Sequence, residues 1–223
     1  MDRSAVMRTD VVVELENARL DALLSVPADA RAVVLFAHGS GSGRASPRNA
    51  MVAHVLENAG LATLLVDLLT TDEQAQDART GLLRFDIDLL ADRVLGASQW
   101  LRARPVSSAL ALGYFGASTG AAAALHAASE NHDVFAVVSR GGRPDLARDC
   151  LKAVRAPSLL IVGGDDVPIL PLNDEACRLL GASAQLVVVP GATHLFEEPG
   201  ALEQVARLSC DWFVNHLPPA AGA

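Results

Sequence analysis

Lysine and cysteine are scarce in this sequence of 223 residues, which contains a single lysine, Lys152, and three cysteines. The cysteines lie far apart, at Cys150, Cys177 and Cys210, and no C-x-x-C pair occurs. An odd number of widely spaced cysteines indicates neither a disulfide framework nor a zinc site. We therefore expect each cysteine to be a small buried apolar side chain.

Basic residues and long apolar runs are also limited. The chain has 18 lysine and arginine residues against 26 acidic ones, which gives a formal net charge of −8. Nucleic acids and anionic membranes are usually bound through clustered basic residues, so this balance argues against both partners. Residues 1–10 contain charges and no apolar run, unlike a secretory signal, and no apolar run reaches the ~20 residues of a membrane span. We expect a cytoplasmic protein, and nothing in the sequence indicates its oligomeric state.

The chain contains instead many short apolar runs that alternate with segments of helical spacing. Its length predicts a single domain over residues 1–223, with a core over about 11–216 and frayed ends. Predicted strands cover residues 31–37, 61–66, 109–115, 134–138, 158–162 and 185–189. Predicted helices cover residues 47–58, 84–102, 119–129, 144–154, 171–180 and 199–216. The alternation predicts an α/β fold with a mostly parallel sheet and helices on both of its faces.

Two segments lie outside this alternation. Residues 11–16 and 19–26 surround Asn17-Ala18 and predict an antiparallel hairpin added at one edge of the sheet. The segment Thr70–Gly81, rich in Asp, Gln and Thr, is the longest one predicted to be irregular, and it follows the carboxyl end of a strand. Ligands bind outside such strand ends, so this loop either borders a site or is simply solvated.

A nucleophile pattern occurs at Gly116-Ala-Ser118-Thr-Gly120, between a predicted strand and an alanine-rich helical segment. This is G-x-S-x-G in the strand, turn and helix context that presents a reactive serine. The turn is expected to hold Ser118 in a strained conformation, and the two glycines remove Cβ atoms that would collide with the neighbouring strand and helix. Ser118 is the candidate nucleophile.

A serine hydroxyl needs a neighbouring base, so a partner histidine is expected. Four of the six histidines lie in or beside predicted helices, where a packed or solvated imidazole is the usual outcome. His194 lies between the last predicted strand and the last helix, and it is the candidate base. Asp165 and Asp166 follow the strand before it, which gives the order Ser, Asp, His of the α/β-hydrolases. The residues alone do not choose between the two aspartates.

A reaction at a carbonyl also needs two backbone N–H groups for the developing oxyanion. Thr119, directly after the serine, is expected to supply one of them. The glycine-rich segment His38–Gly43 after the first parallel strand is expected to supply the other, from Ser40. A phosphate-binding loop is the competing interpretation, but neither G-K-[ST] nor G-x-G-x-x-G is present there.

Four motifs together resemble the small, lidless α/β-hydrolases related to the dienelactone hydrolase family. They are His38-Gly-Ser-Gly-Ser-Gly43, Gly116-Ala-Ser-Thr-Gly120, Gly163-Gly-Asp-Asp166 and Gly191-Ala-Thr-His194. The resemblance implies an α/β-hydrolase fold, and it favours Asp166 as the acid because relatives tend to show Gly-Gly-x-Asp at this strand end. Dienelactone hydrolases proper carry a cysteine nucleophile where this chain has Ser118, so the resemblance implies serine ester hydrolysis rather than dienelactone cleavage.

The segments around the expected site add three predictions. Only residues 143–156, about one helix, separate two successive strands, so no cap domain is expected and the site should be open and shallow. Arg140 follows a strand end, where it either binds a substrate carboxylate or phosphate or pairs with an acid. The candidate acids are Asp67, Asp145, Asp165 and Asp166. Phe196, together with Phe36 and Phe115, is expected to line the site.

The sequence therefore predicts a serine hydrolase that acts on a small ester, thioester or lactone. Ser118 attacks the acyl carbon, His194 acts as general base, Asp166 orients the imidazole, and an acyl-enzyme forms. We expect no metal ion and no organic cofactor, because this triad chemistry needs neither. Two alternatives stay open. One is a non-catalytic homologue that acts as a binding or regulatory protein, and the other is a triad enzyme that performs acyl transfer or perhydrolysis.

Overall fold

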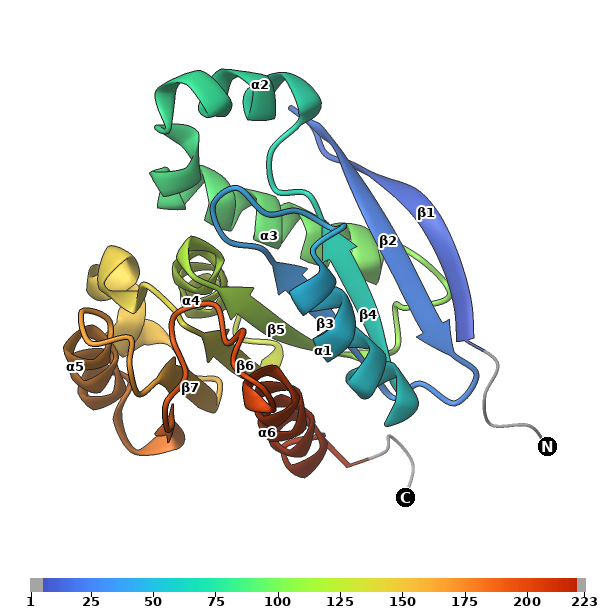
Figure 1. Ribbon diagram of the computed structural model, residues 1–223. Helices are drawn as coiled ribbons and strands as arrows, with labels where there is room; N and C mark the ends of the chain where they lie inside the picture. Colours follow the sequence, from blue (N-terminus) through green and yellow to red (C-terminus); the bar gives the residue numbers. More distant parts are fainter. Residues whose placement is uncertain (1–5, 220–223) are drawn as a thin grey trace.

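An eight-stranded sheet forms the centre of the structure, a computed structural model in which residues 6–219 are described (Figure 1). Its strands are β1 (Val6–Glu14), β2 (Arg19–Pro27), β3 (Ala32–Ala37), β4 (Leu61–Val66), β5 (Ala111–Ala117), β6 (Val134–Arg140), β7 (Ser158–Gly163) and β8 (Ala184–Val189). The spatial order is β1-β2-β4-β3-β5-β6-β7-β8. The β1–β2 and β2–β4 pairs are antiparallel, and every pair from β4 to β8 is parallel. The predicted α/β fold with a mostly parallel sheet and an N-terminal antiparallel hairpin is confirmed.

The hairpin differs from the prediction at its first strand. β1 begins at Val6 and ends at Glu14, whereas residues 11–16 were expected, and the N–H of Leu15 donates to the carbonyl of Ala18 across the turn at 2.8 Å. Charged side chains such as Arg8 and Asp10 interrupt the apolar pattern in residues 6–10, although their backbones pair with β2 throughout. An edge strand tolerates such residues because solvent reaches it. Of the ends predicted to fray, outside about 11–216, residues 6–10 instead form part of β1, and residues 1–5 and 220–223 lie outside the described residues.

Helices cover both faces of the sheet, as predicted. The α-helices are α1 (Pro47–Asn58), α2 (Thr71–Thr80), α3 (Ile87–Arg102), α4 (Thr119–Glu130), α5 (Leu170–Leu180) and α6 (Ala201–Asn215), and the 3₁₀ segments are η1 (Leu83–Phe85), η2 (Pro144–Ala153) and η3 (Gly181–Ser183). On one face, α3 packs beside α4, α4 beside η2, and η2 beside α5, while α1 and α6 pack together on the other face.

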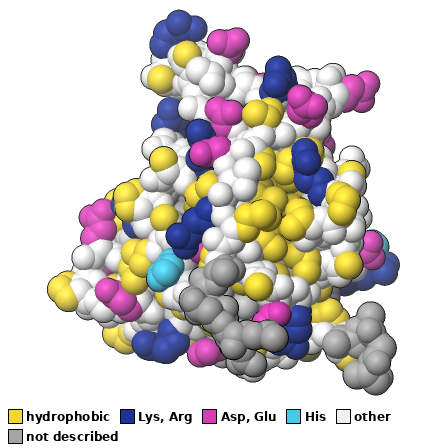
Figure 2. All heavy atoms as spheres, turned by 90° about the vertical axis from the view of Figure 1, so that its right-hand side faces the viewer, with side chains coloured by type: hydrophobic (Ala, Val, Ile, Leu, Met, Phe, Trp, Pro, Cys, Tyr) yellow, Lys and Arg dark blue, Asp and Glu magenta, His cyan; other side chains and the backbone are white. Residues whose placement is uncertain are grey.

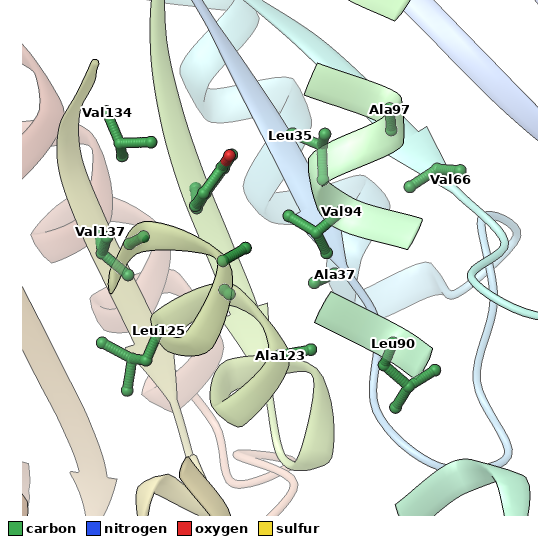
Figure 3. Packing of buried hydrophobic residues seen from close by; sticks show 14 of the residues in the cluster. Leu35, Ala37, Val66, Leu90, Val94, Ala97, Ala123, Leu125, Val134 and Val137 are labelled. Atoms are coloured by element: carbon green, nitrogen blue, oxygen red, sulfur yellow. The ribbon is translucent and has the colours of Figure 1, made fainter. Parts of the chain in front are cut away.

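The alanine content of α4 explains how closely this helix approaches the sheet. All of its residues from Thr119 to Leu125 are buried, and most of them are alanine. Figure 3 shows Ala123 of α4 on the side of Leu90 of α3, while Leu125 of α4 lies on the side of Val137 of β6. Small side chains let the helix backbone lie near β5, so the turn between them is short and tightly constrained.

Two predicted helices differ from the structure. The segment predicted at 84–102 is divided into η1 and α3, because Asp86 caps α3 by accepting a hydrogen bond from the Leu89 N–H at 3.0 Å. The segment predicted at 144–154 is 3₁₀ with a kink at Ala147, where φ is −113°. Between β6 and β7 the chain forms only this short layer, in agreement with the expectation that no cap domain is inserted there.

Residues 71–80 form α2, although the sequence predicted an irregular loop from Thr70 to Gly81. The Thr70 and Glu73 side chains form a reciprocal capping box at its start, and Gly81 ends it with a left-handed φ of 66°. Asp77 is the only buried residue of this helix. The Asp77 carboxylate accepts hydrogen bonds from the Arg84 backbone N–H at 3.0 Å and from Arg84 Nε at 2.7 Å. Polar contacts therefore attach α2 to the segment that follows it, beyond the carboxyl end of β4 (Figure 1).

The face on the right-hand side of Figure 1 mixes charges of both signs with apolar area. Figure 2 shows basic and acidic side chains interspersed there around an apolar patch. A basic stripe of the kind that binds nucleic acid is not seen on this face. Within residues 6–219, no helix has the length and apolar character needed to cross a membrane.

Candidate active site

The turn between β5 and α4 holds Ser118 in a conformation that residues other than glycine rarely adopt. Its φ is 53° and its ψ is −121°, as the strained turn predicted from the sequence requires. Such strain costs on the order of 1–3 kcal/mol and persists only where the surroundings enforce it. A Cβ on Gly116 would collide with the backbone of Ala121, and one on Gly120 would collide with the carbonyl oxygens of Ala37 and His38. Both glycines are therefore required by the turn.

Hydrogen bonds tie this turn to the end of the neighbouring strand β6. The Ser118 N–H donates to the carbonyl oxygen of Arg140 at 3.2 Å, and the Arg143 N–H donates to the carbonyl oxygen of Ser118 at 3.1 Å. β5 ends at Ala117, two residues beyond its predicted end, and β6 ends at Arg140 rather than at Val138. Ser118 and Arg140 consequently lie at the same edge of the sheet, one just after a strand and one at a strand end.

Asp166 and His194 form a hydrogen-bonded pair, with 2.6 Å between the Asp166 Oδ2 and His194 Nδ1 atoms. A carboxylate only accepts hydrogen bonds, so Nδ1 carries the hydrogen and Nε2 of the neutral imidazole is left as an acceptor. Asp166 is 8% exposed, whereas Asp165 is exposed and contributes its backbone N–H to the carbonyl of Ala192 at 2.9 Å. The geometry thus favours Asp166, the residue that the family resemblance had selected.

Phe196 lies two residues after His194, and its side chain is buried beneath the loop that carries the histidine. Its φ is 57°, its side chain is 1% exposed, and it belongs to the apolar cluster between the sheet and the α1 and α6 layer. Phe36 and Phe115 are buried in the same cluster, with 4.7 Å between their ring centroids. The sequence placed these three aromatic side chains along the site, but the structure places them in the core. Phe85 of η1 lines the cavity instead.

The glycine-rich segment after β3 packs directly on the serine turn. A Cβ on Gly39 would lie 2.9 Å from both the Ala117 carbonyl oxygen and the Ser118 Cβ, so no larger residue fits. The Oγ atom of Ser40 lies 3.2 Å from the Oγ1 atom of Thr119. The structure therefore brings together the two residues whose backbone N–H groups the sequence proposed for an oxyanion.

His38 holds this segment against the end of β4. The Leu68 N–H donates to His38 Nε2 at 3.0 Å, so Nδ1 carries the hydrogen and donates to the Gly39 carbonyl at 3.0 Å. Burial lowers the pKa of the imidazole below 6.5, and the Gly39 hydrogen bond and the Asp67 charge oppose this only partly. Both ring nitrogens of His38 are engaged in hydrogen bonds to the backbone, so neither is available to accept the serine proton.

A cavity of about 460 Å³ lies over these groups. Its lining includes Ser118, His194, Asp166, Ser40, Thr119, Arg140, Arg143, Arg48, Phe85 and Ile169. A second cavity of about 240 Å³ lies on the other side of Ser40 and Thr119, lined by Leu69, Ala78, Leu90 and residues of α2 and η1. The two cavities share Gly39, Ser40, Ser42 and Thr119 in their linings, with three arginines lining the larger cavity and Leu69 and Leu90 lining the smaller one.

Arg140 is buried at this site without an acidic partner. It is 7% exposed, and its Nη1 atom has no hydrogen-bond partner within residues 6–219. Burial, together with the positive charge of Arg48, lowers the pKa of Arg140 to about 10. Three of the acids that the sequence offered as partners are paired with other residues, in the pairs Asp67–Arg44, Asp145–Arg143 and Asp166–His194, and Asp165 is exposed. Of the two alternatives that the sequence left open for Arg140, the structural ion pair is therefore not formed.

Comparison with known proteins places the chain in a family. The model of the Dienelactone hydrolase family matches residues 20–213. The chain belongs to this family. A crystal structure of dienelactone hydrolase from Anabaena variabilis has 54% identity, covers 96% of this chain and 99% of that one, and superposes with a TM-score of 0.93. Est1E from Butyrivibrio proteoclasticus, at 14% identity, covers 93% of this chain and 98% of that one with a TM-score of 0.78, and this likeness concerns the fold.

The chain is also similar to part of a longer protein from Mycobacterium tuberculosis. That protein carries the provisional name phosphoribosyl transferase and is 58% identical over 195 residues, which are 87% of this chain and 43% of the relative. The chain thus spans less than half the length of that protein. The name describes the longer protein as a whole.

Sequence reasoning did not identify Arg48, Phe85 or Ile169 as members of the site. They come from α1, η1 and the residue before α5, and no motif marks them. Only the folded arrangement of loops at the carboxyl end of the sheet brings them to Ser118. Among residues 6–219, no group of three or more His, Cys, Asp or Glu side chains is arranged to hold a metal ion.

Proposed function

We propose that this chain is a serine hydrolase that cleaves a small ester, thioester or lactone through a Ser118-His194-Asp166 triad. The observation that carries the proposal is the 2.6 Å pair of Asp166 and His194 at the lining of the same cavity as Ser118. The pairing leaves Nε2 of the imidazole as the nitrogen that can accept the Ser118 proton, and the carboxylate stabilises the imidazolium that proton transfer creates.

The proposed reaction has two half-reactions. The Ser118 Oγ attacks the acyl carbon, and His194 Nε2 takes the hydroxyl proton while the electron pair of the carbonyl moves to its oxygen. Backbone N–H groups of Ser40 and Thr119 bind this oxyanion. Collapse of the intermediate expels the leaving group, which receives the proton from His194. Water then attacks the acyl-enzyme with His194 again as base, and the acid is released.

The arrangement of the oxyanion segment supports acyl chemistry over nucleotide chemistry. In this segment, Gly39 packs against Ala117 and Ser118 of the serine turn, and the hydroxyl of Ser40 lies beside the hydroxyl of Thr119. The segment also lacks the G-K-[ST] and G-x-G-x-x-G patterns of phosphate-binding loops. Phosphoribosyl transfer, which the name of the longer relative suggests, is therefore the less supported function for this chain.

Labelling with a fluorophosphonate probe and reading the intact mass tests the proposal. We expect one adduct on the wild-type chain, and no adduct on Ser118→Ala. Ser129→Ala is the matched control because Ser129 lies near the far end of the same helix α4, and it should be labelled like the wild type. His194→Ala should lower the labelling rate, since no base then takes the hydroxyl proton.

Two results would contradict the proposal. Labelling of Ser118→Ala at the wild-type rate would show that another residue reacts. A wild-type chain that neither reacts with the probe nor turns over any short-chain p-nitrophenyl ester would favour the non-catalytic homologue. Acyl transfer is distinguished by adding a competing alcohol or hydrogen peroxide and analysing the products, because a hydrolase gives mainly the free acid.

A further inference from the structure

The guanidinium of Arg140 is a positive charge that is nearly removed from solvent and lacks an anion. It is 7% exposed, its Nη1 has no hydrogen-bond partner in the described chain, and it lines the cavity that contains Ser118. An uncompensated buried charge costs several kcal/mol in general, and such a group in a folded protein is explained by a catalytic role, by strain or by a bound water or ion. The position therefore points to a negatively charged group that belongs in this cavity.

Arg48 adds a second guanidinium to the same place. It lines the cavity, and its charge is one of the causes that lower the pKa of Arg140. Its Nη1 atom lies 3.1 Å from Glu197 Oε1, but its Nε atom is buried without a partner in the described chain. Two like charges thus converge on one cavity, and each keeps an N–H donor that is unused.

The other charged groups of this cavity are already paired. Arg143 holds Asp145 through two hydrogen bonds of 2.9 and 2.8 Å, and Asp166 holds His194. Glu197, the partner of Arg48, is 63% exposed, so solvent screens its charge. Among the described residues of this cavity, the group that still lacks an anionic partner is therefore Arg140, and beside it the Nε atom of Arg48 lacks a hydrogen-bond acceptor.

We propose that Arg140 and Arg48 form a subsite for a phosphate group carried by the substrate of Ser118. A phosphate monoester has a charge of about −1.5 to −2 at pH 7 and three acceptor oxygens, so it can serve both guanidinium groups at once. A carboxylate carries one charge and two oxygens. The two converging arginines match the phosphate better, and the rigid link between Ser118 and Arg140 fixes where the phosphate lies relative to the attacked acyl carbon.

The proposal rests on the proposed function only in calling the bound molecule a substrate. Phosphate binding itself can be measured on a chain that lacks the nucleophile. The Ser118→Ala chain is titrated calorimetrically with phenyl phosphate and with benzoate, which present a phosphate and a carboxylate on the same ring. We expect phenyl phosphate to bind at least tenfold more tightly than benzoate, and to raise the thermal midpoint of the chain.

Two variants in the Ser118→Ala background assign the binding to residues. Arg140→Gln and Arg48→Gln should each weaken phenyl phosphate binding at least tenfold and reduce the thermal shift that it causes. Arg48 is partly exposed at the start of α1, so its replacement keeps the test valid if Arg140→Gln fails to fold. Arg148→Gln is the control, because Arg148 is 62% exposed and pairs with Glu175 away from this cavity.

The outcomes decide the proposal either way. Equal affinity for benzoate and phenyl phosphate would overturn the preference for phosphate, and binding that survives both arginine variants would overturn the subsite. Probe labelling of Ser118 is a separate measurement, so the proposed function can fail while phosphate binding holds, or hold while phosphate binding fails. If both hold, the ratio of kcat/KM for a phosphate-bearing ester to that for p-nitrophenyl acetate should fall at least tenfold in Arg140→Gln.

Discussion

The backbone N–H of Ser118 donates a hydrogen bond to the carbonyl oxygen of Arg140, at a distance of 3.2 Å. Strands β5 and β6 are paired up to Ala117 and Arg140, so this bond continues the parallel ladder by one residue into the serine turn. The position of the serine relative to the buried arginine is therefore set by the sheet and not by a mobile loop. A substrate that places a negative group at Arg140, as proposed above, would lie at a fixed distance from the Ser118 hydroxyl.

Replacing Asp166 and Asp165 one at a time tests which of these neighbouring aspartates acts with His194. We expect Asp166→Asn to lower kcat for a p-nitrophenyl ester about 10²- to 10⁴-fold, because the amide no longer holds the required tautomer of His194 or stabilises its charged form. Asp165→Asn should stay within about twofold of the wild type, because Asp165 is exposed. Steady-state kinetics measures both, and equal losses in the two variants would contradict the assignment of Asp166.

Gly120 tests how tightly the serine turn is packed. A Cβ at Gly120 would meet the carbonyl oxygens of Ala37 and His38, which belong to rigid backbone, so Gly120→Ala should cost at least about 3 kcal/mol of unfolding free energy. Gly96→Ala is the control in another helix, where the added Cβ meets the end of the flexible Leu15 side chain. There the gain in helix propensity of about 1 kcal/mol offsets the crowding. Urea unfolding of both variants should show this difference, and a cost in Gly120→Ala no larger than in Gly96→Ala would contradict it.

His38 should make stability depend on pH in mildly acidic solution. Burial lowers the pKa of His38 below 6.5, so the folded chain favours the neutral imidazole. Its contribution is complete above about pH 6.5 and is lost as the pH falls toward the lower pKa of the folded state. His38→Phe leaves the Leu68 N–H without its acceptor and should cost about 1–3 kcal/mol at pH 8. That difference from the wild type should narrow toward pH 5, and a difference independent of pH would refute this role.

Asp77 should also make stability depend on pH, but in more strongly acidic solution than His38. Burial of this carboxyl acts to raise its pKa, but hydrogen bonds from the backbone and side chain of Arg84 outweigh it and hold the pKa below 3.8. The stabilisation is therefore complete above about pH 4 and is lost as the pH falls through the lower pKa of the folded state. We expect Asp77→Asn to lower the thermal midpoint at pH 7, with the difference shrinking at pH 3.

An exposed carboxylate provides the comparison for Asp77. Asp92→Asn on α3 changes the same chemical group at an exposed position, so its midpoint should match the wild type at both pH values. A loss in Asp77→Asn that is as large at pH 3 as at pH 7 would show that the side chain contributes through packing rather than through its charge.

The order of strands and helices could be predicted because the central strands are apolar on both faces. β3, β4 and β7 are buried at every position, and such uninterrupted runs are easily recognised in a sequence. Helix α2 was missed for the opposite reason, since it has no apolar face to recognise. Its start was nevertheless encoded by Thr70 and Glu73, whose spacing is that of a capping box.

The candidate site was predictable where local motifs determine geometry and not where distant segments meet. The strained φ of Ser118 could be predicted from the residues within two positions of it, and the structure shows this positive φ. The partner of Arg140 depends on which acids other arginines bind, and Asp67, Asp145 and Asp166 all have other partners. The position of Phe196 depends on whether its ring turns toward the core or toward the cavity, and the adjacent residues do not predict which of the two occurs.

Helix α2 borders the second cavity, yet among its residues Asp77 alone is buried, and that residue is polar. Changes at the exposed positions of α2 therefore leave the apolar core untouched. Ala78 lines the cavity from such a position, so natural variation or directed evolution can alter it at little thermodynamic cost, whereas Asp77 both lines the cavity and holds the helix. Related chains with the same serine turn are therefore free to differ in the shape of this wall.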